Sequence, residues 1–230
     1  MTLRLLSGGA AQALVGALAA EFRLRHGLEI EGEFGAVGAM RAKLEAGHPA
    51  DLVILTSAIL ADLAENGLVL GDSIRDVGDV ATAVAIRQGD SAPEVGDEAS
   101  LRGALLAADA IYFPDPALAT AGIHFAKVLD RLGIAEEVAK RLQTFPNGAT
   151  AMAALAKAPE RRPIGCTQVT EIKATAGAEL VAELPRGFDL ITRYTAGVAA
   201  RSARPDDATA LIALLTGSDA AAERRRCGFG

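Results

Sequence analysis

The feature that most constrains the fold is a repeated unit, in which a short apolar run is followed by a glycine-containing turn and then by a helical pattern. Residues 3–6 form such a run, residues 7–9 interrupt it, and leucines spaced for one helical face follow within residues 10–26. Residues 29–34 and 35–38 repeat the run and the turn. Consecutive units of this kind are typical of a parallel sheet with helical crossovers.

The same pattern returns later in the chain. Further strands are predicted at residues 52–55, 80–87, 110–113, 143–145, 163–167 and 189–199, and further helices at 39–46, 123–132, 149–157, 205–216 and 220–226, with a long loop over 114–122 and a turn at 147–148. The chain has 230 residues, which suits two α/β lobes of about 100–120 residues each. The predicted fold class is therefore α/β.

Composition excludes several classes of function. Aromatic residues make up 4% of the chain, Trp is absent, and the net charge is −6, so neither base stacking nor a phosphate backbone has a matching surface. Nucleic acid is not an expected partner.

Cys166 and Cys227 lack metal-ligand spacing and are interpreted as buried or idle thiols, although a disulfide between them is also possible. The three histidines are scattered, so no metal and no cofactor is predicted.

The beginning of the chain bears on localisation. Residues 3–6 already read as a strand, and no basic segment followed by an apolar run and a cleavage site precedes them. No apolar run approaches the roughly 20 residues that a membrane-spanning helix needs. The sequence as written predicts a cytoplasmic protein without membrane insertion, and a periplasmic one if a leader was removed.

Three small-residue loops could bind an anion through backbone amides, because the first N–H groups of a helix lack intrahelical partners and carry partial positive charge. Neither predicted lobe carries net positive charge, so local dipoles would have to recognise the ligand. The candidate residues share small size or a hydroxyl group next to a strand end. They are Ser7, Gly8 and Gly9; Gly35, Ala36 and Val37; and Thr120, Ala121 and Gly122.

These segments, with residues 47–54, 115–116, 146–148 and 164–167, resemble a known family. The chain is similar to the substrate-binding proteins of bacterial ABC importers, with the type II periplasmic-binding-protein fold, in the molybdate-binding branch that also includes aconitate-isomerase-like members. Its most specific motif is Pro49-Ala50-Asp51. Asp51 itself is expected to hold a loop by hydrogen bonds to backbone groups.

The resemblance implies a two-lobed clamp that closes on a ligand between its lobes. Lobe 1 would comprise residues 1–80 plus 196–230, lobe 2 residues 81–195, and residues 80–87 and 193–199 would be two hinge strands. It also adds Asn147, Thr167 and Gln168 to the ligand-binding residues. Two departures concern the ligand: residues 35–37 contain no hydroxyl, and Gln168 lies in the region of a family tyrosine.

The resulting hypothesis is a protein that binds a small anion, either an oxyanion or an organic carboxylate, and serves an ABC permease if it is exported. The alternative is a cofactor-free isomerase of the aconitate-isomerase type, which needs an acid/base group in a closed site. His124, two residues after Gly122, is the candidate, although it also fits an ordinary helix surface. A cytosolic ligand sensor is a third possibility. Whether the chain is an enzyme stays open.

Overall fold

The chain forms two compact units. The computed structural model describes residues 2–230; unit 1 comprises the chain up to Val80 together with Thr192–Gly230, and unit 2 comprises Ala81–Ile191. The chain thus returns to unit 1 at residue 192, whereas the family resemblance placed this point at 196. It passes from unit 1 to unit 2 within strand β4 (Arg75–Arg87) and back at the start of β9 (Ile191–Val198).

Unit 1 is built on a sheet whose order begins β2-β1-β3-β9. Strands β1 (Thr2–Gly8), β2 (Glu29–Gly35) and β3 (Leu52–Thr56) are parallel, and β9 is antiparallel to β3. Four consecutive residues of β3, from Leu52 to Leu55, are fully buried, as expected for a strand covered on both faces.

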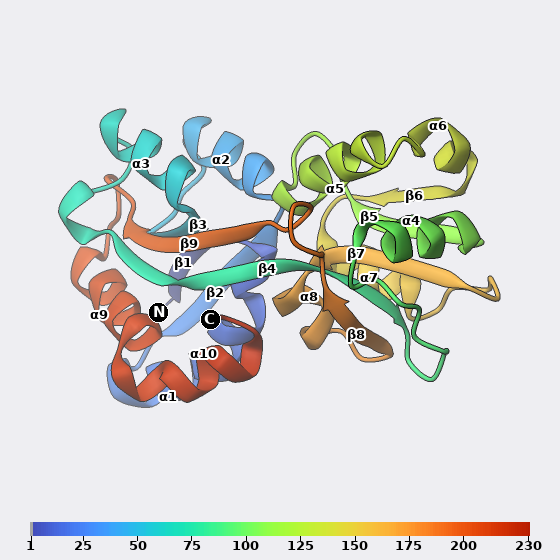
Figure 1. Cartoon of the computed structure of the whole chain (residues 1–230). Coiled ribbons are helices and arrows are strands. Elements are labelled where there is room, and N and C mark those ends of the chain that lie inside the picture. The colour runs from blue at the N-terminus through green and yellow to red at the C-terminus, as the bar shows by residue number, and fades with distance from the viewer. Residues whose placement is uncertain (1) are drawn as a thin grey trace. The chain divides into compact units, whose positions relative to one another are not determined.

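The helices of unit 1 cover both faces of this sheet. In Figure 1, α2 (Val37–Glu45) and α3 (Ser57–Glu65) lie on one face, and α1 (Gln12–His26), α9 (Pro205–Thr216) and α10 (Ala221–Cys227) lie on the other. Short 3-10 turns occupy Gly9–Ala11, Gly71–Ser73 and Ser218–Ala220. Helix α1 ends at Gly27, whose φ of 69° is the left-handed conformation that glycine adopts most easily.

Unit 2 repeats the arrangement with a sheet of order β4-β7-β5-β6. Strands β5 (Ala110–Pro114), β6 (Leu142–Phe145) and β7 (Pro163–Gln168) are parallel to one another. Both β7 and β8 (Ala178–Glu183) pair with β4 in the antiparallel sense.

The helices of unit 2 are α4 (Glu98–Ala107), α5 (Thr120–Arg131), α6 (Ala135–Val138), α7 (Gly148–Leu155) and α8 (Val169–Ala174), with a 3-10 turn at Ala139–Arg141. The core on the α4–α6 side contains Phe113, Phe125 and Cys166, all buried. Cys166 and Cys227 are buried thiols in different units, as the sequence indicated.

Several helices begin earlier than their apolar pattern predicts. Helix α2 starts at Val37 instead of residue 39, and α5 starts at Thr120, so the loop predicted over 114–122 ends at Ala119. The starts were placed too late because glycines stand in both first turns, Gly38 in α2 and Gly122 in α5, and were interpreted as parts of turns, although Val37 lies on the same buried face as Met40 and Leu44. As a consequence Val37, Thr120, Ala121 and Gly122 lie in first helical turns. Between residues 2 and 230, no helix is long and apolar enough to span a membrane.

Candidate functional site

The predicted loops of unit 1 lie together at one edge of its sheet. In the register of β1 with β2, Gly8 is opposite Gly35, and Ser7 of β1 is opposite Ile54 of β3. Because the three strands are parallel, their carboxyl ends reach the same edge, and a helical segment follows each of them. The structure thus brings together Ser7, Gly8 and Gly35, three of the residues that the sequence indicated as ligand contacts.

Gly8 is the point of closest packing at this edge. A Cβ atom added to Gly8 would lie 2.9 Å from Val37 Cγ1 and 3.0 Å from Tyr194 Cε1. Val37 begins α2, and Tyr194 is a residue of β9 that is 3% exposed. Helix α2 and the tyrosine ring therefore approach the backbone of Gly8 so closely that the position has no room for a side chain.

Helix starts at this edge are not capped by side chains. Ala36 precedes α2 and Thr56 precedes α3, and neither residue makes a side-chain hydrogen bond to the first turn. Ser7 is fully buried, and its hydroxyl donates to the carbonyl oxygen of Gly8 at 2.9 Å. The first N–H groups of α2 and α3 thus remain suited to an external acceptor, whereas the Ser7 proton is already used.

One pair of residues at this edge was not predicted. Thr56 and Ser57 follow the buried strand β3 and begin α3, next to the end of β1. Both are partly exposed. The signal was present in the sequence, because two hydroxyl residues directly follow an apolar run and precede leucines with helical spacing at positions 60 and 63.

In unit 2, α5 begins against the end of β5. A Cβ atom at Gly122 would collide with the carbonyl oxygens of Pro114 and Asp115, so only glycine allows this approach. Asp115 Oδ1 accepts hydrogen bonds from the N–H groups of Ala117 and Leu118, which holds the intervening loop. Thr120 and Ala121 occupy the first turn of α5, before Gly122.

The start of α7 is occupied by groups of the protein itself. Asn147 caps this helix, because its Oδ1 accepts a hydrogen bond from the N–H of Thr150 at 2.9 Å. The buried carboxylate of Glu171 accepts hydrogen bonds from the N–H groups of Gly148 and Ala149, and a Cβ atom at Gly148 would collide with it. A ligand is therefore not needed to satisfy the first turn of α7.

Thr167 and Glu171 form a buried pair beneath that turn. Thr167 Oγ1 donates to Glu171 Oε2 at 2.6 Å. Burial raises the pKa of the Glu171 carboxyl above its usual range, and the hydrogen bonds from Thr167 and from three backbone N–H groups oppose this rise. The side chains of two predicted ligand-binding residues, Asn147 and Thr167, are thus engaged in intramolecular hydrogen bonds.

Gln168 differs from these two residues. It ends β7, is only 2% exposed, and neither its amide nitrogen nor its amide oxygen has a hydrogen-bond partner in the described chain.

His124, the candidate acid/base group, lies in α5 and is partly buried. Its Nε2 is 2.7 Å from the carbonyl oxygen of Phe188. A carbonyl only accepts hydrogen bonds, so Nε2 carries the proton, and Nδ1 is the nitrogen left for proton transfer.

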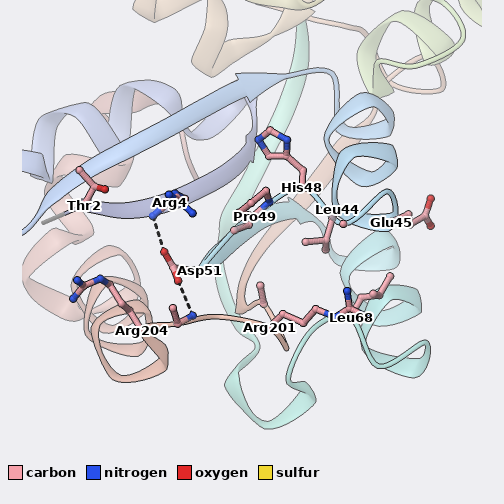
Figure 2. A pocket seen from close by; sticks show the side chains of 14 residues that line it. Thr2, Arg4, Leu44, Glu45, His48, Pro49, Asp51, Leu68, Arg201 and Arg204 are labelled. Carbon is pink, nitrogen blue, oxygen red and sulfur yellow. Dashed lines mark hydrogen bonds between the residues drawn. The ribbon is translucent and has the colours of Figure 1, made fainter.

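The motif at Pro49-Ala50-Asp51 lies at the opposite edge of the unit 1 sheet, where β1 and β3 begin (Figure 2). Asp51 is 6% exposed, and its Oδ2 accepts a hydrogen bond from the N–H of Arg4 at 2.9 Å. Its Oδ1 accepts from the Ser202 hydroxyl at 2.8 Å and from the Ala203 N–H at 3.1 Å. The prediction that Asp51 holds loops through hydrogen bonds is confirmed.

A pocket of about 470 Å³ surrounds this aspartate. Its lining includes Arg4, His48, Arg201 and Arg204, as Figure 2 shows. Arg204 forms an ion pair with Asp207, whereas the guanidinium groups of Arg4 and Arg201 have no hydrogen-bond or ion-pair partner among residues 2–230. Basic side chains thus gather at the edge that lacks the glycine loops.

Both units are open α/β sheets, and in proteins of this architecture small molecules bind outside the carboxyl ends of the parallel strands, where the small-residue loops of this chain lie. The family model for bacterial extracellular solute-binding proteins matches residues 3–230, and the chain belongs to that family. The predicted α/β fold of the periplasmic binding proteins is thereby confirmed.

Known proteins extend this comparison. The chain is 27% identical over 180 residues to an aconitate isomerase from a Pseudomonas species. The matched region covers 78% of this chain and 66% of the relative, just under two thirds of the relative's length. A periplasmic molybdate-binding protein from Azotobacter vinelandii superposes with a TM-score of 0.81 at 16% identity, covering 99% and 98% of the two chains. A sulfate-binding protein from Mycobacterium tuberculosis superposes with a TM-score of 0.71 at 18% identity, covering 100% and 86%. At these identities the two structures establish the fold.

Proposed function

We propose that this chain binds a small organic anion, a carboxylate, through backbone N–H groups. The observation that carries the proposal is the edge of unit 1 at which Gly8, Gly35 and Thr56 end three parallel strands. There α2 and α3, each of nine residues, start without a side-chain cap. The first N–H groups of each helix lack intrahelical partners and, with the helix dipole, favour an anion. Close packing of Val37 and Tyr194 against Gly8 fixes the first turn of α2 relative to the end of β1.

The structure of unit 2 refines which residues are proposed as contacts there. The start of α7 is filled by Asn147 and Glu171, so we assign ligand contacts in unit 2 to the first turn of α5 and to Gln168. Thr120 at the start of α5 makes no side-chain hydrogen bond to another described residue and supplies a hydroxyl.

A carboxylate is favoured over a tetrahedral oxyanion for two reasons. The Ser7 hydroxyl donates to Gly8, and residues 35–37 carry no hydroxyl, so among the described residues at this edge only Thr56 and Ser57 offer hydroxyl donors to a tetrahedral oxyanion. The 27% identical relative is an aconitate isomerase, whose name refers to a tricarboxylate. If the chain is exported, membership of an extracellular solute-binding family supports delivery of the ligand to an ABC permease.

A binding screen tests the proposal. Thermal unfolding is measured with molybdate, tungstate, sulfate, phosphate, and di- and tricarboxylates, and a specific ligand at 100 to 1,000 times its Kd should stabilise the fold by roughly 3–4 kcal/mol. A carboxylate should give the largest shift. Thr120→Ala should weaken its binding, whereas Thr209→Ala, at an exposed position of α9, should not. If none of these anions stabilises the protein, the proposed function is wrong.

An isomerase is the second candidate, supported by the same relative. Proton transfer at the allylic carbon of an unsaturated carboxylic acid would use Nδ1 of His124, because Nε2 is engaged with Phe188. The bound tri- and dicarboxylates are incubated with the protein in D₂O and analysed by mass spectrometry. Incorporation of solvent deuterium would favour the isomerase, and its complete absence for every bound acid would favour a binding protein without this activity.

A further inference from the structure

Unit 2 contains a group of buried polar side chains without hydrogen-bond partners. Both amide atoms of Gln168 and the hydroxyl oxygens of Thr82 and Thr170 have no partner in the described chain, and these residues are 2%, 1% and 1% exposed. A buried polar atom that lacks a partner costs about 1–3 kcal/mol, so folded proteins contain few of them. Gln168 and Thr170 are two residues apart in the sequence, and Thr82 pairs with Gln168 across the sheet, so this concentration of unpaired polar atoms needs an explanation.

Two of them are neighbours on one face of the sheet. Thr82 of β4 is directly opposite Gln168 of β7 in the antiparallel register, and residues opposite each other in such a pair place their side chains on the same face. Thr82 uses its backbone fully, because its N–H donates to Leu190 and its carbonyl accepts from Leu184. Only its hydroxyl is left over.

The alternation of β7 identifies that face. A Cβ atom at Gly165 would contact Met152 and Leu155, so this residue faces α7. Cys166 belongs to the core on the side of α5, and Gln168, two residues further on, points to the same side. The Thr82–Gln168 pair thus lies at the carboxyl end of β7, on the face that carries α5, whose first turn approaches the neighbouring strand end.

The chemistry of the pair limits what can satisfy it. The amide of Gln168 offers two N–H donors and one acceptor oxygen, and the threonine hydroxyl offers one donor and two acceptor lone pairs. An anion that only accepts hydrogen bonds satisfies the amide nitrogen and leaves the amide oxygen without a donor. A ligand hydroxyl supplies both a donor and an acceptor.

We infer that Gln168 and Thr82 recognise a hydroxyl group on the ligand, and that the ligand is a hydroxylated carboxylic acid. This inference rests on the proposed carboxylate-binding function and narrows its ligand class. A site with buried hydrogen-bonding groups discriminates strongly against an analogue that lacks the matching group, because its own polar atoms are then left unpaired.

The test uses pairs of acids that differ by one hydroxyl group. Calorimetric titration compares malate with succinate, and citrate with propane-1,2,3-tricarboxylate, for the full chain and for Gln168→Leu and Thr82→Val. The unsubstituted protein should bind the hydroxylated member of at least one pair about tenfold or more tightly. Gln168→Leu should reduce this preference to less than about twofold, and Thr82→Val should reduce it partially.

Stability provides the control for a purely structural role. Neither side chain has a partner to lose, so Gln168→Leu should leave the urea midpoint unchanged or raise it. A lowered midpoint together with an unchanged preference would show that buried water satisfies the pair, and would overturn the inference.

The remaining outcomes separate this inference from the function on which it rests. Equal affinity for both members of each pair, or equal weakening of both by Gln168→Leu, would contradict hydroxyl recognition while leaving carboxylate binding intact. If no acid binds at all, both the inference and the proposed function are wrong.

Discussion

The two edges of the unit 1 sheet use opposite kinds of chemistry. At the carboxyl ends of β1, β2 and β3, the chain presents glycines, small residues and uncapped helix starts. At the amino ends of β1 and β3, it presents a buried aspartate and a pocket lined by arginines. The edge with formal positive charge is therefore not the edge with the loops suited to an anion. A search for the anion site that relied on clustered arginines alone would therefore select the wrong edge for the site proposed here.

The most specific sequence motif also belongs to the charged edge. Asp51 joins the start of β1 to the segment after β9, by accepting hydrogen bonds from Arg4, Ser202 and Ala203. This segment leads directly into α9, so one carboxylate connects three parts of unit 1 that are distant in sequence. The motif therefore serves the fold, and its distinctiveness gives no direct indication of ligand chemistry.

The largest expected effect follows from this structural role. Asp51→Ala leaves two backbone N–H groups and one hydroxyl without their acceptor, and we expect a loss of about 3 kcal/mol in the free energy of unfolding. Urea denaturation measures it. Asp51→Asn retains one acceptor oxygen and should lose less. The ligand affinity of the folded Asp51→Ala protein should stay unchanged; a stability loss below about 0.5 kcal/mol would contradict the role that the hydrogen bonds indicate.

The edge at which β1, β2 and β3 end, called here the glycine-loop edge, shows how much of the site the sequence could predict. Alternating strands and helices were sufficient to place Gly8 and Gly35 at one edge, because parallel strands with crossover helices admit few other arrangements. The hydroxyl pair at Thr56 and Ser57 was missed even though its local signal resembled that of the other loops.

Other features could not be predicted because they depend on tertiary contacts. Asn147 and Thr167 carry the residue types that a ligand site uses, and only the structure shows that a helix cap and Glu171 occupy their side chains. Glu171 reaches the start of α7 from a helix that follows a different strand, so no spacing in the sequence reports it. The sequence also could not predict that the Gln168 amide lacks hydrogen-bond partners, since this depends on how the surrounding side chains pack.

A smaller effect is expected from the glycine-loop edge itself. Gly8→Ala places a methyl group 2.9 Å from Val37 and 3.0 Å from Tyr194, which displaces the first turn of α2 from the strand end. We expect the affinity for the carboxylate found in the screen to fall about tenfold, which corresponds to roughly 1.4 kcal/mol. Gly16→Ala is the matched control, because a Cβ atom there has nothing within 4 Å. Equal affinities for the two variants would remove the evidence for a site at this edge.

The smallest effect is expected from the arginines of the opposite edge. Arg4→Ala combined with Arg201→Ala removes two exposed guanidinium groups that make no ion pair in the described chain, so stability should change little. Carboxylate affinity, measured by the same titration, should change less than about twofold, because these side chains lie at the amino ends of the strands and the proposed contacts lie at the carboxyl ends. A loss of tenfold or more in the double variant, with Gly8→Ala unaffected, would move the anion to the arginine-lined pocket. Side-chain charge, and not the backbone amides of uncapped helices, would then be what this protein uses to bind its ligand.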